Sequence, residues 1–356
     1  MPPHKTIAAR PFAAREVFMK PERSDRLPLP DGLRGLAAFA VAGFHLTAAA
    51  NYDQVPLVEW GWLGVPVFFV ISGFVIPYSM RQATVTWRYA GRYALRRMVR
   101  LDPPLWATIV VMLLTNACLR RMVDTPADDL RWPGTITVIA NLAYLQNLLR
   151  FPNLSMGLWT LCIEVQFYLA ALLLVFLWQR RKAWAVVAFA GLTICSWMGF
   201  NTATSTNTNL FWSAYRTLFP QFCLFSLGIT ACWTRLGRCP TWCFWSIVGG
   251  CCLKLAIDPY PEIAAGIAAA VLLHLAANRD WISRQPIAYL GKISYSLYLM
   301  HWPAGRIVLL GASKLEISGP WLPLLALAVA VGAADLLSRF IEQPAMRLSR
   351  RIELKS

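Results

Sequence analysis

The stretch DGLRGLAAFAVAGFHLT, from Asp31 to Thr47, carries two side chains that could do chemistry within an otherwise apolar run. Arg34 and His45 are eleven residues apart. In a helix they would project from one face, separated by about 16 Å along the axis. An arginine can hold an anion, and a neutral histidine can accept a proton from a hydroxyl group. The spacing predicts one path with an anion-binding end and a reactive end, unless His45 only bonds one helix to another.

A second pair of basic side chains, Arg97 and Arg100, lies in the stretch RYALRRMVRLDPPLW. Residues three apart share a helical face, and two guanidinium groups presented together suit phosphate oxygens. We expect Pro103 and Pro104 to disturb the chain where it enters the bilayer. The alternative for the arginines is a topological anchor at the inner membrane surface.

A carboxylate, Glu164, lies well inside the apolar stretch GLWTLCIEVQFYLA. A lone buried carboxylate tends to become neutral, so it needs a partner. The partner could be His45, an arginine, or the hydroxyls and amides of neighbouring helices. We therefore expect Glu164 to orient the histidine or to hold an arginine, or else to form a structural hydrogen bond.

A fourth group lies in GKISYSLYLMHWPAGR, which is rich in hydroxyls and aromatic rings. Such a run could line a polar cavity for a sugar or a pantetheine arm, with the candidate residues Ser294, Tyr295, Tyr298 and His301. His301 could equally be an interfacial or packing histidine. Further on, Glu342 in SRFIEQP is expected to pair with a neighbouring cation in a structural role.

The elements that carry these residues have the composition of a membrane protein. The chain has 356 residues, 57% hydrophobic and 15% charged, whereas soluble domains carry about 25% charged residues. Repeated apolar runs of about 17–24 residues predict transmembrane helices. We therefore predict an all-α polytopic bundle with ten spans, at 33–50, 61–80, 105–122, 157–178, 183–200, 215–234, 241–257, 261–277, 287–310 and 320–341.

The net charge of +16 does not indicate a nucleic-acid partner, because the basic residues lie in short blocks between the apolar runs, as membrane topology requires. These blocks are 81–100, 180–182, 235–238, 279–292 and 347–355. All of them face the cytoplasm if both termini are cytoplasmic and the short apolar segment 135–149 is re-entrant. If 135–149 crosses instead, the protein has eleven spans and most blocks invert. We predict the first arrangement, in contact with membrane lipids.

The domain organisation follows from these runs. Residues 1–30 are expected to form a flexible basic cytoplasmic tail, 31–348 a single multi-pass domain in a cell membrane (the bacterial inner membrane), and 349–356 a second basic tail. Nine cysteines are scattered mainly through the apolar runs, without a CxxC pair accompanied by histidines. They are interpreted as packing residues, so we expect no metal site and no permanently bound cofactor.

The motifs together resemble membrane acyltransferase family 3, whose members O-acylate polysaccharides, lipid-linked sugars and small molecules. The matching elements are DGLRG with His45, GVPVFFVISGF, the RxxR of Arg97 and Arg100, WTLCIEVQFY, ISYSLYLMHWP and a closing E-x-P. The chain departs from the usual pattern at a few positions: Pro66 replaces a frequent aspartate, Asp102 and Leu105 replace tyrosines, Thr160 replaces a serine, and Val165 replaces a second glutamate.

The resemblance implies an acyl-CoA donor on the cytoplasmic side, most often acetyl-CoA, with Arg34, Arg97 and Arg100 receiving it. It implies that His45 is the essential histidine, either as general base or as a transient acyl carrier, with Glu164 orienting it. The implied acceptor is a sugar or polysaccharide hydroxyl, and alternatively a small-molecule or lipid-linked hydroxyl. Some members carry a fused outer hydrolase-like domain. With none in these 356 residues, we expect transfer to finish within the bundle or to pass to a separate protein.

Two other function classes make different predictions. A transporter of an anionic substrate would also place arginine and histidine in a bundle, but it is expected to show paired broken helices in related halves. No internal repeat is visible in the sequence. A non-catalytic scaffold would not need His45, so a His45→Ala protein would keep its function.

Overall fold

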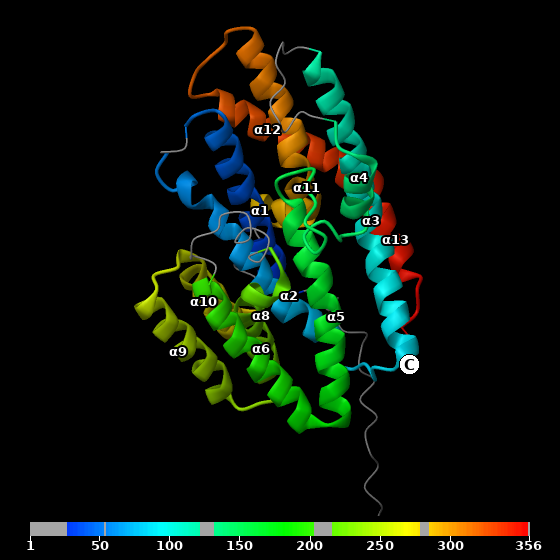
Figure 1. Cartoon of the computed structure of the whole chain (residues 1–356), viewed down its shortest axis with the longest axis vertical. Coiled ribbons are helices and arrows are strands. Elements are labelled where there is room, and N and C mark those ends of the chain that lie inside the picture. Colours follow the sequence, from blue (N-terminus) through cyan, green and yellow to red (C-terminus); the bar gives the residue numbers. More distant parts are fainter. Residues whose placement is uncertain (1–26, 53–54, 122–131, 203–215, 278–284, 355–356) are drawn as a thin grey trace, which may run out of the picture.

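The computed structural model describes residues 27–52, 55–121, 132–202, 216–277 and 285–354. These residues form helices and no strand (Figure 1). The elements are α1 (Pro28–Ala49), η1 (Val58–Leu63), α2 (Gly64–Ser79), α3 (Trp87–Arg120), α4 (Thr135–Leu142), α5 (Leu158–Arg180), α6 (Lys182–Thr202), α8 (Leu218–Arg235), α9 (Thr241–Ile257), α10 (Pro261–Ala276), α11 (Gln285–Lys314), α12 (Leu322–Leu337), the π-helical η3 (Ser338–Glu342) and α13 (Gln343–Arg350).

The prediction of an apolar helical membrane protein is confirmed. Each of the ten predicted apolar runs falls on a helix of the described residues. Five helical segments are long and apolar enough to cross a bilayer, namely Pro28–Ala49, Val58–Ser79, Trp87–Arg120, Leu158–Arg180 and Leu322–Arg350. Large apolar side chains one turn apart, such as Leu169 and Leu173 of α5, point outward with more than half of their surface exposed. Such a stripe suits contact with lipid.

Two sequence expectations about boundaries are revised. Helix α1 begins at Pro28, inside the segment 1–30 expected to be a tail, and residues 1–26 of that segment lie outside the described part of the chain. Helix α3 begins at Trp87, well before the predicted span 105–122, and the hydroxyl of Thr86 caps it by accepting a hydrogen bond from the Tyr89 backbone N–H. The basic block 81–100 is therefore largely helical.

The chain does not break at Pro103 and Pro104, since α3 continues through both residues as one helix of 34 residues. Hydroxyl groups bond the backbone around this point: Tyr295 donates to the Leu101 carbonyl at 2.9 Å and Thr108 to the Pro104 carbonyl at 2.8 Å. In a membrane bundle, neighbouring helices and hydroxyls satisfy the backbone around a proline, so the helix tolerates it. As a result Arg97, Arg100 and the lipid-spanning half of α3 belong to one continuous helix.

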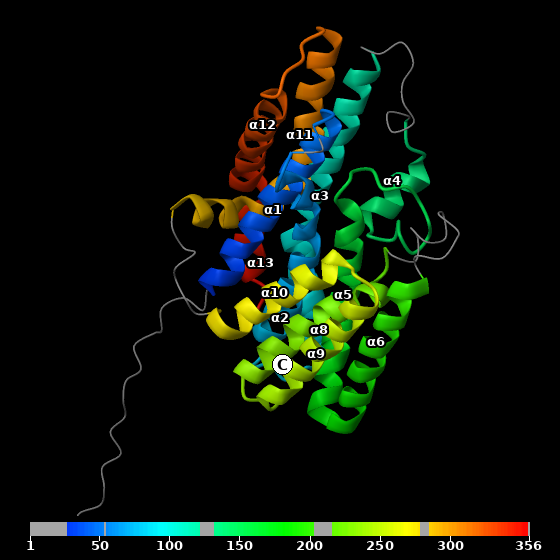
Figure 2. The same ribbon diagram turned by 90° about the vertical axis from the view of Figure 1, so that its left-hand side faces the viewer.

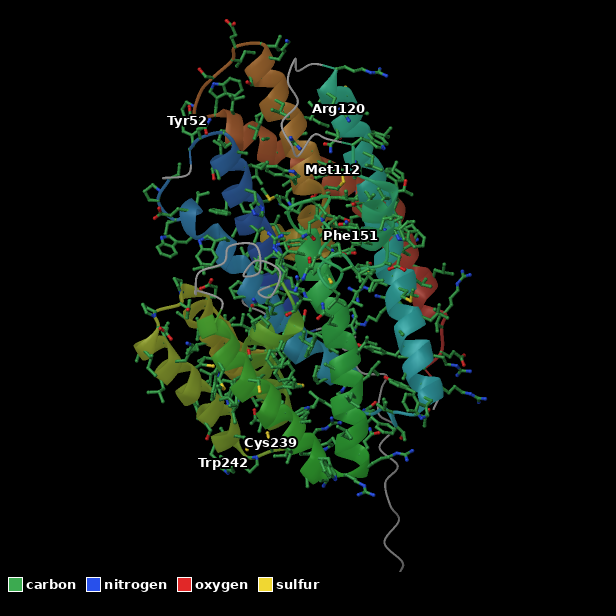
Figure 3. All side chains as sticks on the ribbon, viewed as in Figure 1. Tyr52, Met112, Arg120, Phe151, Cys239 and Trp242 are labelled. Atoms are coloured by element: carbon green, nitrogen blue, oxygen red, sulfur yellow. The ribbon has the colours of Figure 1, made fainter. Side chains whose placement is uncertain are left out.

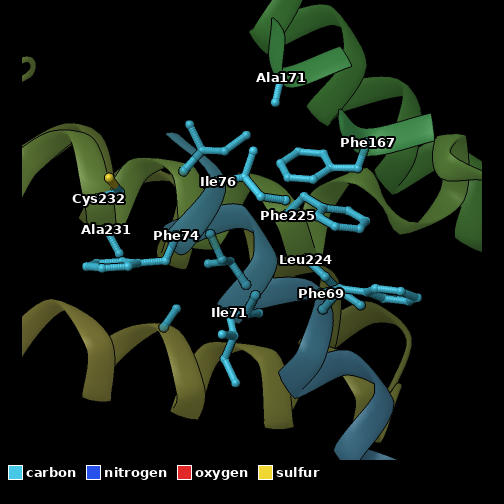
Figure 4. Packing of buried hydrophobic residues seen from close by; sticks show 14 of the residues in the cluster. Phe69, Ile71, Phe74, Ile76, Phe167, Ala171, Leu224, Phe225, Ala231 and Cys232 are labelled. Atoms are coloured by element: carbon cyan, nitrogen blue, oxygen red, sulfur yellow. The ribbon is translucent and has the colours of Figure 1, made fainter. Parts of the chain in front are cut away.

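The larger apolar core lies where α2 crosses α8 (Figure 4). The rings of Phe167 and Phe225 stack there with centroids 4.0 Å apart. Glycines let the two backbones touch: a Cβ atom on Gly73 would lie 2.3 Å from the Phe225 carbonyl oxygen, and one on Gly228 would lie 2.0 Å from that of Val70. Small residues at a helix crossing are the usual means of close packing in membranes.

Helices α1 and α11 pack side by side and run parallel (Figure 2). Near their starts, a Cβ atom on Gly35 would lie 2.4 Å from the Gly291 backbone nitrogen. Further along both helices, a Cβ atom on Gly305 would lie 2.3 Å from Leu46. The contacts advance in the same direction along both helices, so the two ends of α1 lie near the corresponding ends of α11.

Helices α2 and α5 also run parallel, because Phe69 packs edge-on against Trp159 while Ser72 bonds Glu164 further along both helices. In the sequence, α3 and the eight-residue α4 separate α2 from α5. At 1.5 Å per residue α4 is about 12 Å long, well short of a bilayer core of about 30 Å. Side-chain amides fold the segment after α4 back on itself, with Asn141 bonding the Pro152 carbonyl and Asn147 bonding that of Trp159.

The ends of the helices sort to two ends of the bundle (Figure 3). Tyr52, just after α1, and Arg120, at the end of α3, lie at one end. Cys239 and Trp242, at the junction of α8 and α9, lie at the other. The basic residues Arg235 and Arg238 therefore belong to the end opposite Tyr52.

Candidate active site

The reactive end of the predicted path contains two histidines rather than one. His45 Nδ1 and His301 Nε2 are 2.9 Å apart, and the rings stack with centroids 5.1 Å apart and planes 12° apart. His301 is completely buried, whereas His45 is half-buried. The parallel packing of α1 on α11 brings the two rings together, which the linear sequence does not indicate.

The neighbours of this pair hold it in place. His301 Nδ1 lies 2.8 Å from the Tyr298 carbonyl oxygen on the preceding turn of α11. The Trp302 ring meets His45 edge-on, with centroids 6.4 Å apart. The Tyr298 hydroxyl lies 2.8 Å from that of Thr160, and its ring rests on Gly157, where a Cβ atom would come within 2.7 Å of it. His301 is thus held by Tyr298 of its own helix, and Tyr298 is in turn held against α5.

At the other end of the path, Arg97 lies between two tyrosine rings. Its guanidinium carbon is 5.1 Å from the Tyr93 ring centroid and 5.0 Å from that of Tyr168. Its Nε–H also donates to the Tyr93 hydroxyl at 3.1 Å. Aromatic faces stabilise a cation and leave the remaining guanidinium N–H groups available for a ligand.

Arg100 lies one turn further along α3 and is close enough to Arg34, Arg97 and Glu342 to interact with them electrostatically. The three arginines singled out in the sequence therefore gather from α1 and α3. Like charges repel, so such a cluster favours an anion that neutralises it. Glu342 is the last residue of the π-helical turn η3. It accepts a 2.5 Å hydrogen bond from the buried Ser296 hydroxyl of α11.

Glu164 belongs to the arginine end. Its Oε1 accepts hydrogen bonds from the Tyr168 hydroxyl at 2.6 Å and the Ser72 hydroxyl at 3.3 Å, and it interacts electrostatically with Arg97. Of the partners considered for Glu164, the structure supplies hydroxyls and an arginine. The side chain hydrogen-bonded to His45 is His301, so the orienting position that the sequence suggested for Glu164 is occupied by His301.

The residues expected to line an acceptor cavity divide into two sets. Tyr295, Tyr298 and His301 face other helices, through the Leu101 carbonyl, Thr160 and His45. Ser294 instead donates to the Gly291 carbonyl of its own helix at 2.9 Å. Tyr93, Ser72, Ser296 and Tyr144 were not among the residues selected from the sequence. Of these, the Tyr144 hydroxyl donates a hydrogen bond to Asp102 at 2.9 Å. An aspartate in this position needs a buried partner, and that need could have indicated Tyr144 from the sequence.

The polar groups thus extend from three arginines on α1 and α3 to two histidines on α1 and α11. Among the described residues, no three His, Cys, Asp or Glu side chains gather as metal ligands would. A family model described as an acyltransferase domain matches residues 28–339, which include the arginine cluster and the histidine pair. The chain belongs to acyltransferase family 3. Members of this family are membrane-bound acyltransferases, in agreement with the apolar helices.

Several relatives are similar over most of this chain. The peptidoglycan O-acetyltransferase OatA of Listeria monocytogenes is 27% identical over 89% of the chain and 55% of its own length. The acyltransferase MdmB of Streptomyces mycarofaciens is 28% identical over 93% and 94%, and the membrane-bound transacylase BcsY of Komagataeibacter xylinus is 28% identical over 83% and 76%. The chain spans about half the length of OatA. No solved structure matches the chain.

Proposed function

We propose that this protein moves an acyl group, in the simplest case acetyl, from acyl-CoA to a hydroxyl of a sugar or polysaccharide. The observation that carries the proposal is the arrangement along α1, with an arginine cluster at Arg34 and a histidine pair at His45 on the same helix. The arginines suit the phosphates of CoA. The rise of a helix separates the two sites by about 16 Å, a distance that an extended pantetheine arm can bridge.

The proposed topology has ten spans, with both termini cytoplasmic and the segment 135–149 re-entrant. The parallel orientation of α2 and α5 supports it, since α3 alone then crosses between them. The parallel orientation of α1 and α11 supports it as well, because seven crossings separate them without α4 and eight with it. The positive-inside rule assigns the end with Arg235 and Arg238 to the cytoplasm. The donor then enters from the arginine end.

The proposed reaction is a direct transfer. His45 accepts the proton of the acceptor hydroxyl, the oxygen attacks the thioester carbonyl, and the carbon–sulfur bond breaks. The protonated His45 then returns the proton to the departing CoA thiolate. The products are an ester and free CoA, and the histidine ends as it began. A route through a transient acyl-histidine remains the alternative for an acceptor on the outer side.

A carbohydrate acceptor is supported by relatives whose names describe peptidoglycan O-acetylation. A small-molecule or lipid-linked hydroxyl is the alternative within the same chemistry. The competing hypothesis of an anion transporter is not favoured by the family.

The test uses the full chain in lipid nanodiscs with acetyl-CoA and separate pools of polysaccharide, peptidoglycan fragments and lipid-linked sugars. Wild type is expected to release CoA only when the right pool is present, and to label that pool with radioactive acetyl. His45→Ala should abolish release, and the variant carrying both Arg97→Ala and Arg100→Ala should lose acetyl-CoA binding. A wild type that binds no acetyl-CoA would overturn the donor, and a His45→Ala protein with normal turnover would overturn the role of His45.

A further inference from the structure

The hydrogen bonds around His301 determine which nitrogen of each ring carries a proton. The Tyr298 carbonyl oxygen can only accept, so His301 Nδ1, 2.8 Å away, must donate to it. A neutral His301 then has an unprotonated Nε2, which can only accept. Its partner at 2.9 Å is His45 Nδ1, so His45 must donate from that nitrogen. A neutral His45 protonated at Nδ1 carries its lone pair on Nε2.

We infer that His301 is a positioning residue, which holds His45 in the tautomer with a basic Nε2. This inference rests on the proposed function, because it assigns Nε2 as the atom that takes the acceptor proton. The second ring nitrogen of a catalytic or ligating histidine commonly determines the state of the first. Here that second partner is another histidine rather than a carboxylate.

The packing supports a positioning role rather than a direct one. His301 is completely buried, while His45 is half-buried. Both nitrogens of His301 are engaged within the bundle, Nδ1 by the Tyr298 carbonyl and Nε2 by His45. His301 therefore has no nitrogen left for a substrate and acts through His45.

The pair also explains how the transient positive charge is accommodated. When Nε2 of His45 accepts the hydroxyl proton, His45 becomes an imidazolium that still donates from Nδ1 to His301 Nε2. This hydrogen bond becomes charge-assisted, and such bonds are stronger than neutral ones. When Nε2 returns its proton to the CoA thiolate, the pair regains its original hydrogen bonds. No proton has to leave the pair by another route.

The first experiment reads the tautomer without any reaction. The full chain is labelled with 15N-histidine and placed in nanodiscs, and the His45 signals are identified by their loss in His45→Ala. Protonated and unprotonated ring nitrogens have well-separated 15N shifts. Wild type is expected to show His45 protonated at Nδ1 and bare at Nε2. A wild type with the proton on Nε2 would overturn the inference.

The second experiment uses two substitutions at position 301. His301→Phe keeps a planar ring but offers no acceptor, so His45 should lose its single tautomer and turnover should fall about 100-fold or more, within the range assigned to general-base catalysis. His301→Gln offers an amide oxygen to His45 Nδ1, so it should restore the Nδ1-protonated state and most of the activity. The control is His274→Phe. It removes a half-buried histidine whose ring stacks on Phe244, with centroids 4.3 Å apart, and it should change neither the tautomer nor the rate.

The outcomes separate this inference from the proposed function. If His301→Phe keeps both the tautomer and the rate, His301 has no positioning role, although the acyltransferase assignment stands. If wild type transfers no acyl group, the proposed function fails, and the 15N shifts alone decide the tautomer. Should His301→Phe fail to fold in a thermal melt, the wild-type shifts and the His301→Gln protein still test the inference.

Discussion

Three ionisable side chains at the candidate site have different kinds of partner. Arg97 is held by two aromatic rings, Glu164 by two hydroxyls, and His45 by a second histidine. An ionisable group is costly inside a membrane bundle unless neighbours satisfy it. The difference suits the proposed function, in which the arginines bind an anion and the histidine presents one defined nitrogen.

Replacing Arg97 by lysine should weaken acyl-CoA binding although the charge is kept. Lysine cannot reproduce the planar contact between the Tyr93 and Tyr168 rings or the hydrogen bond from Nε. We expect the Kd for acetyl-CoA, measured by isothermal titration, to rise about tenfold in Arg97→Lys and about 100-fold in Arg97→Ala.

Arg180→Lys is the matched control, since Arg180 also lies over an aromatic ring, that of Phe176 at 4.8 Å. It lies near the end of α5, away from the cluster, and should leave the Kd unchanged. An equal effect of the two lysine substitutions would mean that Arg97 contributes only general positive charge.

Removing the Tyr168 hydroxyl should disturb the arginine end through Glu164. Tyr168→Phe keeps the ring beside Arg97 but removes the 2.6 Å hydrogen bond to the carboxylate. A lost hydrogen bond to a charged group costs about 1.5–3 kcal/mol. We expect the KM for acetyl-CoA to rise about tenfold or more with little change in kcat, measured by CoA release.

The control is Tyr78→Phe, because the Tyr78 ring also faces an arginine, Arg81, at 4.3 Å. Its KM should match that of wild type. A Tyr168→Phe enzyme that loses kcat instead would place Glu164 in the chemical step.

At the scale of elements, the close crossing of α1 and α11 determines whether the histidines meet. Gly35 is the last residue of the DGLRG motif, and its Cα rests against the backbone of Gly291. The motif thus combines an arginine for the ligand with a glycine for the crossing. One turn of displacement between the helices would move His45 past His301.

Gly35→Ala should therefore reduce both stability and activity. The new Cβ would lie 2.4 Å from the Gly291 nitrogen and 2.6 Å from the Leu290 carbonyl carbon, and backbone atoms cannot rotate away. Forcing such a contact costs about 1–3 kcal/mol, so we expect a lower melting temperature in detergent and slower turnover.

Gly91→Ala is the matched control, because the space around Gly91 on α3 is open. Alanine in an exposed helix interior is favoured over glycine by about 1 kcal/mol, so this variant should melt at the same temperature or slightly higher. If both alanine variants behave alike, the α1–α11 crossing is looser than its geometry indicates.

At the scale of the whole molecule, the position of the site relative to the bilayer depends on whether 135–149 crosses. The proposed topology puts the residues on both sides of this segment on the outer face. We therefore expect cysteines at Thr135 and Met156 to react with an impermeant maleimide added to intact cells. A cysteine at Thr241, after the basic residue Arg238, should react only after permeabilisation.

This labelling uses a protein in which the exposed Cys118 and Cys252 are changed to serine. A cysteine at Ser318, between α11 and α12, serves as the control for outer labelling. Opposite accessibility of positions 135 and 156 would establish eleven spans. With the N-terminus in the cytoplasm, the arginine cluster on α1 and α3 would keep its place, and the basic blocks from 180–182 onward would face outward.

The sequence alone determined the all-helical membrane character, because apolar runs of bilayer length have one stable arrangement in lipid. It also selected Arg34 and His45, because ionisable residues are conspicuous in an apolar run, and Arg97 and Arg100, because residues three apart share a helical face. Only the tertiary structure decided their partners. Hydrogen bonds such as His45–His301 join residues 256 apart in sequence, and they depend on the glycine crossing of α1 and α11. Periodicity reports the face of one helix, whereas a partner depends on which other helix packs there and in which direction it runs.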